Sequence, residues 1–220
     1  MSTKTDSTTK LRAPLTRERV LRAAIALADE SGIESLSMRK LGQELGVEAM
    51  SLYNHVANKG DILDGMVDVV AGKFEVASKG GNWKTAIRQS AISAHEVLLQ
   101  HPWACSLSMS RPKVGPAKLG YVDSMLGSLR EAGFSIQMAH NAMHAIENHI
   151  SGFTLQELSF PSSIEEMGPE VVAILLRRQT VGEYPNLSEV VLGATHDDQI
   201  EFEFVLDLIL DGLERVRDTG

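Results

Sequence analysis

The sequence predicts an all-α protein, and three observations support this. Apolar residues recur with the 3.6-residue period of a helix in nearly every segment, and no alternating strand pattern competes with them. Glycine and proline interrupt this period at intervals that suit helix lengths, with a clear break at residues 78–82. A chain of 220 residues that is 43% hydrophobic can bury a sizeable core. We therefore expect one or two globular helical domains.

Composition excludes several classes of protein. The longest uninterrupted apolar run, residues 171–176, is far shorter than the ~18 residues of a membrane span. The first ten residues are polar and do not resemble a secretory signal, which predicts a cytoplasmic protein without a membrane partner. The single cysteine, Cys105, excludes an internal disulfide and a cysteine zinc site, so a buried inert thiol is expected.

The net charge of −8 is unevenly distributed. Residues 1–60 hold nine Lys or Arg and seven acids, an excess of +2, whereas residues 61–220 carry −10. A mildly basic N-terminal part on an acidic body suits attraction of phosphate to one local face, although so small an excess is also ordinary surface variation.

The N-terminal part is predicted to contain a disordered arm at 1–15 followed by four helices. Thr16 caps a helix at 17–31, and Ser37 caps a short second helix that ends at Gly46. A third helix starts at Val47, and Asp61 caps a longer fourth helix that reaches Phe74. We place the domain boundary between residues 61 and 62.

The body, residues 62–220, continues with five further predicted helices at 83–100, 117–132, 136–158, 169–178 and 197–217. Loops are expected at five breaker sites: His101-Pro102, Arg111-Pro112, Gly133, Phe160-Pro161 and Tyr184-Pro185.

The turn at Gly46 has the length of a helix-turn-helix connection. Apolar residues between Leu41 and Val56 can form one small core that leaves the opposite face of the third helix free. The free face consists of Ala49, Met50, Ser51, Tyr53, Asn54 and His55. Such side chains suit base edges, and Arg39 and Lys59 beside them suit phosphates or guanine. A solvated face on a fragment of a larger helical core is the alternative interpretation.

Residues 37–63, SMRKLGQELGVEAMSLYNHVANKGDIL, resemble the signature of the tetracycline-repressor (TetR) family without a gap. The resemblance is tight over residues 16–64 and looser over 83–217. It implies a transcriptional regulator, usually a repressor, that binds a palindromic operator on double-stranded DNA as a homodimer and is released by a small-molecule effector.

The resemblance also implies DNA contacts at individual positions. Ser37 and Lys59 would bind the DNA backbone, and Arg39 would reach a base or a phosphate. The contacts from the third helix would come from Ser51, Tyr53 and His55. The founding repressor has other residues where Ala49, Met50 and Asn54 stand here, so its operator is not transferable; thymine contact by Met50 and a structural role are equally open.

Specific binding to DNA needs two such three-helix units about one helical turn apart, so a dimer is expected. The last helix is apolar on two sides, and the helix at 136–158 is similar. From these two helices we predict an interface of Ile146, Ile150, Phe153, Phe202, Val205, Leu206, Ile209 and Leu213. Two central helices of a monomer would show the same pattern.

A mostly apolar ligand pocket is predicted in the body. Its candidate lining residues are Met66, Val70, Phe74, His95, Trp103, Met109, Met125, His140, Asn141, His144 and Asn148. His140, His144 and Glu147 lie on one helix face but lack a fourth ligand, so no metal and no cofactor are expected. Glu75 and Ser108 stand where the tetracycline repressor is expected to carry two histidines, which argues against a tetracycline–magnesium effector.

Two rival functions remain. An all-α enzyme would use His140, His144 and Glu147 as acid, base or metal groups, and an adaptor would bind proteins through the free face. No phosphate loop, catalytic triad or cysteine nucleophile supports the enzyme, and only a regulator should select a palindrome and lose affinity steeply with salt.

Overall fold

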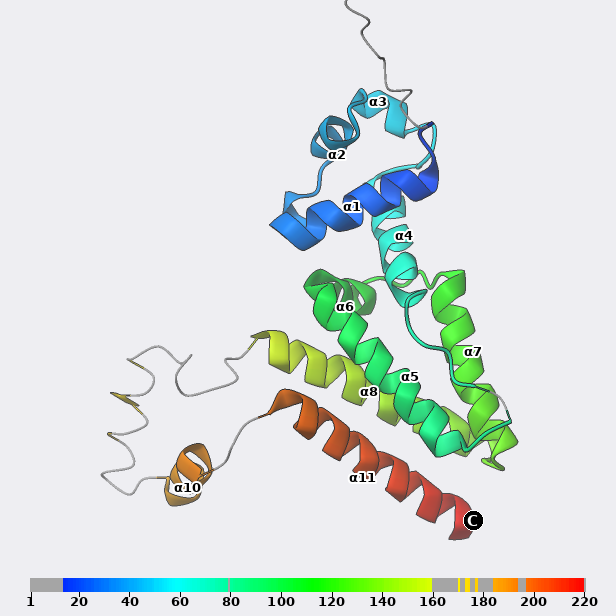
Figure 1. Ribbon diagram of the computed structural model, residues 1–220, viewed down its shortest axis with the longest axis vertical. Coiled ribbons are helices and arrows are strands. Elements are labelled where there is room, and N and C mark those ends of the chain that lie inside the picture. Colours follow the sequence, from blue (N-terminus) through cyan, green and yellow to red (C-terminus); the bar gives the residue numbers. More distant parts are fainter. Residues whose placement is uncertain are drawn as a thin grey trace, which may run out of the picture. The chain divides into compact units, whose positions relative to one another are not determined.

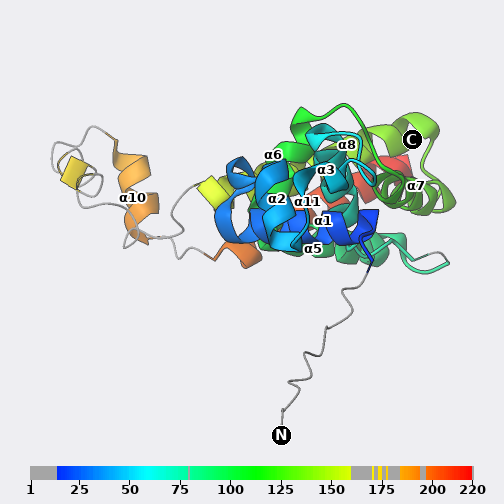
Figure 2. The ribbon, with the colours of Figure 1, turned by 90° about the horizontal axis from the view of Figure 1, so that it is seen from above.

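The computed structural model describes residues 14–78, 80–159, 170, 173–174, 177, 184–193 and 197–219. Within these ranges every regular element is a helix, which confirms the all-α prediction (Figure 1, Figure 2). The chain divides into two compact units, residues 1–66 and 67–220, which we call the head and the body. The expected arm at 1–15 and the helix expected at 169–178 fall largely outside the described residues.

The head contains α1 (Arg17–Ser31), a 3-10 turn η1 (Ile33–Ser35), α2 (Met38–Leu45) and α3 (Ala49–Leu52). Thr16 caps α1 by accepting a hydrogen bond from the Arg19 amide at 3.2 Å, as its sequence predicts. The third helix is shorter than expected, because after Leu52 the chain continues to Val56 as hydrogen-bonded turns. The turn η1 was not predicted.

Helix α4 (Lys59–Ala71) begins two residues before the expected start, and the prediction that Asp61 caps it is wrong. Asn58 is the cap: its side-chain oxygen accepts from the Asp61 amide at 2.9 Å. Asp61 instead accepts two bonds from Arg17, at 2.6 and 2.8 Å, and one from the Ala57 amide at 3.0 Å. The first turns of α1 and α4 are thereby joined, and this pairing raises the pKa of Arg17.

The head is held together by an apolar core. Helices α1, α2, α3 and the first part of α4 each contribute to it through one face. The buried side chains are Val20, Leu21, Ala24, Ile25, Ala28, Leu36, Leu41, Leu45, Leu52, Val56, Ile62 and Met66.

In its described residues the body contains the end of α4 and the helices α5 (Trp83–Gln100), α6 (Pro102–Ser110), α7 (Pro116–Glu131), α8 (Ile136–Ser159), α10 (Pro185–Gly193) and α11 (Asp198–Thr219). Helices α6 and α10 correct two expectations, because Pro102 and Pro185 open helices where loops were predicted. Proline suits the first helical position, where no amide partner is needed. The loops at Arg111-Pro112 and Gly133 are present, and Phe160-Pro161 lies outside the described residues.

Helices α5 and α8 pack against each other in the body, α11 packs along both, and α6 and α7 also contact both (Figure 1). Phe202 of α11 stacks on two histidine rings. Its ring centre lies 4.0 Å from that of His95 in α5 and 4.6 Å from that of His149 in α8. The Thr154 hydroxyl donates to the Ile150 carbonyl at 2.6 Å, so it accepts from Nδ1 of His95 at 2.9 Å. Aromatic stacking and buried hydrogen bonds therefore join α5, α8 and α11.

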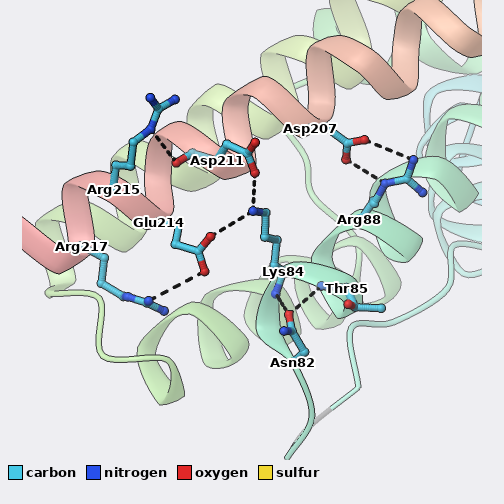
Figure 3. Close-up of polar contacts among 9 residues, drawn as sticks. All are labelled: Asn82, Lys84, Thr85, Arg88, Asp207, Asp211, Glu214, Arg215 and Arg217. Carbon is cyan, nitrogen blue, oxygen red and sulfur yellow. Dashed lines mark hydrogen bonds and ion pairs between the residues drawn. The ribbon is translucent and has the colours of Figure 1, made fainter.

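A row of ion pairs lies along the outer side of α5 and α11 (Figure 3). Arg88 donates to Glu203 at 2.6 Å and to Asp207 at 2.8 Å, and Lys84 pairs with Asp211 and Glu214. Pairing with Arg88 lowers the pKa of Glu203. The sequence does not predict these ion pairs, because their partners are more than 100 residues apart. None of the helices in the described ranges is long and apolar enough to cross a membrane.

Candidate nucleic-acid interface and ligand cavity

The turn between α2 and α3 is fixed by two glycines. Gly46 adopts the left-handed conformation, φ 65° and ψ 38°, which a glycine enters without steric cost. At Gly42 a Cβ atom would lie 2.9 Å from the Val47 carbonyl oxygen and 3.2 Å from the Ala49 amide nitrogen. Because both neighbours are backbone atoms, only glycine allows this close approach. The start of α3 is thus placed by the sequence of α2.

The predicted reading face is on the surface of the head. Met50 is 75% exposed and Tyr53 46% exposed, and Asn54 is also exposed. Ala49, Ser51 and His55 are partly exposed. Leu52 points inward and is fully buried, so it anchors α3 to the head while its neighbours face outward.

The predicted phosphate-binding residues are exposed as well. Ser37, Arg39 and Lys59 stand at the starts of α2 and α4. The Ser37 hydroxyl accepts from the Lys40 amide at 3.2 Å, so it caps α2 and keeps its own proton for another acceptor. This face therefore exposes amide, hydroxyl and cationic groups, which are the groups that proteins use to contact nucleic acids.

The body contains a cavity of about 500 Å³, counting the open space at its mouth. Its wall is mostly aliphatic and aromatic, with a few polar groups. The lining residues are Val67, Val70, Ala71, Phe74, Ala94, Leu98, Ala104, Cys105, Ser108, Met109, Lys118, Tyr121, Glu147, Ile150 and Ser151.

One ion pair supplies the charge of this cavity. The Lys118 ammonium of α7 binds the Glu147 carboxylate of α8, and it also lies 5.1 Å from the centre of the Tyr121 ring. Tyr121 meets Phe74 edge to face at 5.2 Å. Burial raises the pKa of Tyr121 and that of Cys105, so both keep their protons at neutral pH. The Cys105 thiol donates to the Ser151 carbonyl at 3.6 Å, consistent with an inert buried thiol.

Only part of the predicted pocket lies in this cavity. Val70, Phe74 and Met109 line it. Met66, His95, Trp103 and Met125 are buried but are not among the lining residues. The four polar residues of α8 that the sequence suggests for a pocket are exposed and do not line this cavity, to which α8 contributes Glu147, Ile150 and Ser151. The four exposed residues are His140, Asn141, His144 and Asn148.

The predicted dimer face also needs correction. Ile146, Ile150, Phe202 and Leu206 are all at least 96% buried within the chain itself, so they cannot meet a second protomer. Phe153, Ile209 and Leu213 are partly exposed. Val205, also predicted for the interface, is exposed, and the opposite side of α11 exposes a further apolar stripe of Ile200, Phe204 and Leu208. The sequence pattern showed a helix apolar on two sides, but it did not show which side faces inward.

Sequence reasoning missed the most chemically distinct wall residues, Lys118 and Tyr121. An isolated lysine one turn before a tyrosine on the buried side of a helix was the available signal. His140 and His144 lie ring to ring at 4.5 Å, and among the described residues no three acid, histidine or cysteine side chains are grouped to hold a metal. Ser108 lines the cavity, whereas Glu75 is exposed.

Comparison with known proteins identifies both units. A family profile for bacterial regulatory proteins of the tetR family matches residues 20–66, and a profile for the tetracyclin repressor-like C-terminal domain matches residues 77–217.

The repressor DrrR1 of Streptomyces coeruleorubidus is 34% identical over 91% of this chain and 77% of its own length. A possible TetR family regulator of Streptomyces coelicolor A3(2) is 32% identical, with a TM-score of 0.75 over 91% of this chain and 99% of that one. ActR of Streptomyces coelicolor in complex with actinorhodin is 25% identical, with a TM-score of 0.79 over 93% and 99% of the two chains. The chain therefore belongs to the TetR family of bacterial regulatory proteins.

Proposed function

We propose that this protein represses transcription by binding a palindromic operator as a homodimer, and that a small molecule in the body cavity releases it. Membership of the TetR family makes the chain a DNA-binding transcriptional regulator that responds to a ligand. The observation that carries the proposal for this chain is the exposed, hydrogen-bonding face of α3, held against an apolar head by Gly42 and Leu52. We expect an operator and an effector that differ from those of the tetracycline repressor. The residues at 49, 50 and 54 differ from that protein in the reading face, and Glu75 and Ser108 differ from it at the expected drug site.

The proposed DNA contacts come from two places on the head. Tyr53 and its neighbours Ala49, Met50, Ser51, Asn54 and His55 enter the major groove. Ser37, Arg39 and Lys59 hold the phosphates on either side. The family resemblance and the exposure of these residues support the assignment.

The DNA contacts are tested by substituting Tyr53 and Lys59 by alanine. A duplex is first selected from a random pool by the wild-type protein, and its dissociation constant is measured by gel shift at several salt concentrations. Tyr53→Ala should weaken binding about tenfold or more by losing a contact worth ~1–3 kcal/mol. Lys59→Ala should reduce the salt dependence by about one released ion. Lys113→Ala removes the same charge from an exposed position between α6 and α7 and serves as the matched control. Unchanged affinity in both head variants would refute the assignment.

We place the dimer interface on the exposed stripe of α11, around Phe204 and Leu208. These two side chains recur four residues apart on the side away from Phe202 and Leu206, so one face of the helix serves the core and the other remains open. A large exposed apolar face is typical of a surface that meets another protein.

A charge at the centre of this stripe should separate the protomers. We expect Leu208→Glu to sediment as a monomer and to lose binding to the palindrome, because two buried carboxylates would face each other near the symmetry axis. Leu119→Glu, at an equally exposed leucine of α7, is the control and should remain dimeric. A Leu208→Glu protein that is still a dimer by analytical ultracentrifugation would place the interface elsewhere.

The rival enzyme hypothesis finds no support in the site that it invoked. His140 and His144 are exposed, and Glu147, its third member, binds Lys118 instead. Glu147 lines the body cavity, and the two histidines are not among its lining residues.

A further inference from the structure

We propose that Asp68 is the positioning residue that couples occupation of the body cavity to α4. This inference rests on the proposed function and concerns how the cavity regulates it. Helix α4 is continuous from Lys59, a proposed phosphate contact in the head, to Ala71 in the wall of the cavity. A displacement of residues 67–71 therefore moves a helix that also belongs to the head.

Asp68 caps a helix that has no cap of its own. The residue before α7 is Gly115, which has no side chain to accept from the first turn, and Pro116 has no amide hydrogen. One oxygen of Asp68 accepts from the Ala117 amide at 2.9 Å and from the Lys118 amide at 3.2 Å. These two amides would otherwise lack a partner, and a carboxylate at a helix N-terminus is further favoured by the helix dipole.

Gly115 allows this approach. A Cβ atom at residue 115 would lie between 2.2 and 2.6 Å from the side-chain atoms of Asp68. The carboxylate therefore occupies the space that a side chain at this position would fill. Glycine at residue 115 and aspartate at residue 68 form one joint between α4 and α7.

Lys118 connects this joint to the cavity. Its amide is held by Asp68, and its ammonium, at the other end of the same residue, binds Glu147 in the cavity wall. An occupant that separates Lys118 from Glu147 must move the lysine side chain. The first turn of α7 then shifts with it, and Asp68 transmits the shift to α4.

The test is a double-mutant cycle that needs no identified ligand, with Glu147→Gln in place of the occupant because it removes the charge that holds Lys118. Operator affinity is measured by gel shift on the duplex selected by the wild-type protein. We expect Glu147→Gln to raise the dissociation constant about fivefold or more in the wild-type background, because the occupant that it replaces releases the operator. A change of this size is within the usual range for coupled sites. In the Asp68→Ala background the same substitution should change it by less than about twofold.

Two further backgrounds separate coupling from simple loss of structure. Asp68→Asn keeps the side-chain oxygen that accepts the two amides, so the response to Glu147→Gln should persist. Gly115→Ala leaves Asp68 in the sequence but displaces it, so the response should disappear. Asp123→Ala, at an exposed aspartate of α7, is the control and should respond as the wild type does.

The outcomes distinguish the two proposals. A wild-type protein that selects no duplex would overturn the proposed function. A protein that binds its duplex but shows no effect of Glu147→Gln, or the same effect in the wild-type and Asp68→Ala backgrounds, would overturn the role of Asp68 alone. Tryptophan emission reports a folded body for each variant, because both tryptophans, Trp83 and Trp103, lie in that unit.

Discussion

The head and the body differ in what they bury. In the described head every buried residue is apolar, and the one enclosed polar side-chain atom without a partner is Oγ of Ser35. In the described body the interior also contains Ser90, His95, His101, Ser124, Ser128 and Thr154. Substitutions on the surface of the head should therefore leave its core intact. In the body, a substitution in the cavity wall should also alter the packing of the helices.

The largest effect that we predict concerns the buried histidine of the body. The pKa of His95 is lowered from an ordinary value of 6.5 to about 4, mainly by burial and in smaller part by His149, while Asp198 opposes the shift. The folded protein therefore keeps His95 neutral where the unfolded chain binds a proton. Stability should fall by about 3 kcal/mol as the pH drops from 6.5 to 4, a loss that His95→Gln removes.

This prediction is checked by urea unfolding at fixed protein concentration, followed by tryptophan emission, between pH 7 and 4. His140→Gln, which makes the same substitution at an exposed histidine of the body, is the control. Glu157 lies 3.2 Å from Nε2 of His95, and burial raises its pKa, which gives folding a proton-uptake contribution of the opposite sign. An identical profile in His95→Gln and wild type would show that the body does not depend on this buried group.

The stability of the head should depend instead on the close backbone approach at Gly42. In Gly42→Ala the added methyl group meets the Val47 carbonyl oxygen at 2.9 Å, so the turn must open. We expect a loss of ~1–3 kcal/mol in head stability, as for other overpacked sites, together with weaker operator binding. Hydrogen exchange of the amides at residues 38–52 measures the loss. Gly120→Ala, where no atom lies within 4 Å, is the control; equal protection in both variants would contradict the close approach.

The difference between the units also explains what the sequence can predict. The head is built from short-range signals: Thr16 and Ser37 cap helices a few residues away, and Gly46 ends α2 as predicted. Its reading face follows from these helices once Leu52 is placed inside. Even here the cap of α4 was misplaced, because the partner of Asp61 is Arg17, 44 residues away.

In the body, periodicity predicts helices but does not determine their orientation. The stripe of Phe202 and Leu206 and the stripe of Phe204 and Leu208 are equally apolar, and only the packing of α5 and α8 determines which one is buried. The cavity depends on the same packing, since its wall combines α4, α5, α6, α7 and α8. The joint of Asp68 with α7 spans 49 residues of sequence, so no local pattern predicts it.

The smallest expected effect concerns the charges on the outside of the body. Arg88 makes two short ion pairs, but its side chain is 33% exposed and those of its partners are 29% and 48% exposed. Water and salt screen such pairs, so Arg88→Met should cost less than about 1 kcal/mol of unfolding free energy, and the cost should shrink in 1 M salt. Urea unfolding at low and high salt measures both. A loss as large as that predicted for His95 would mean that the surface network stabilises the body as much as its interior does, and the contrast between buried and exposed polar groups would not hold.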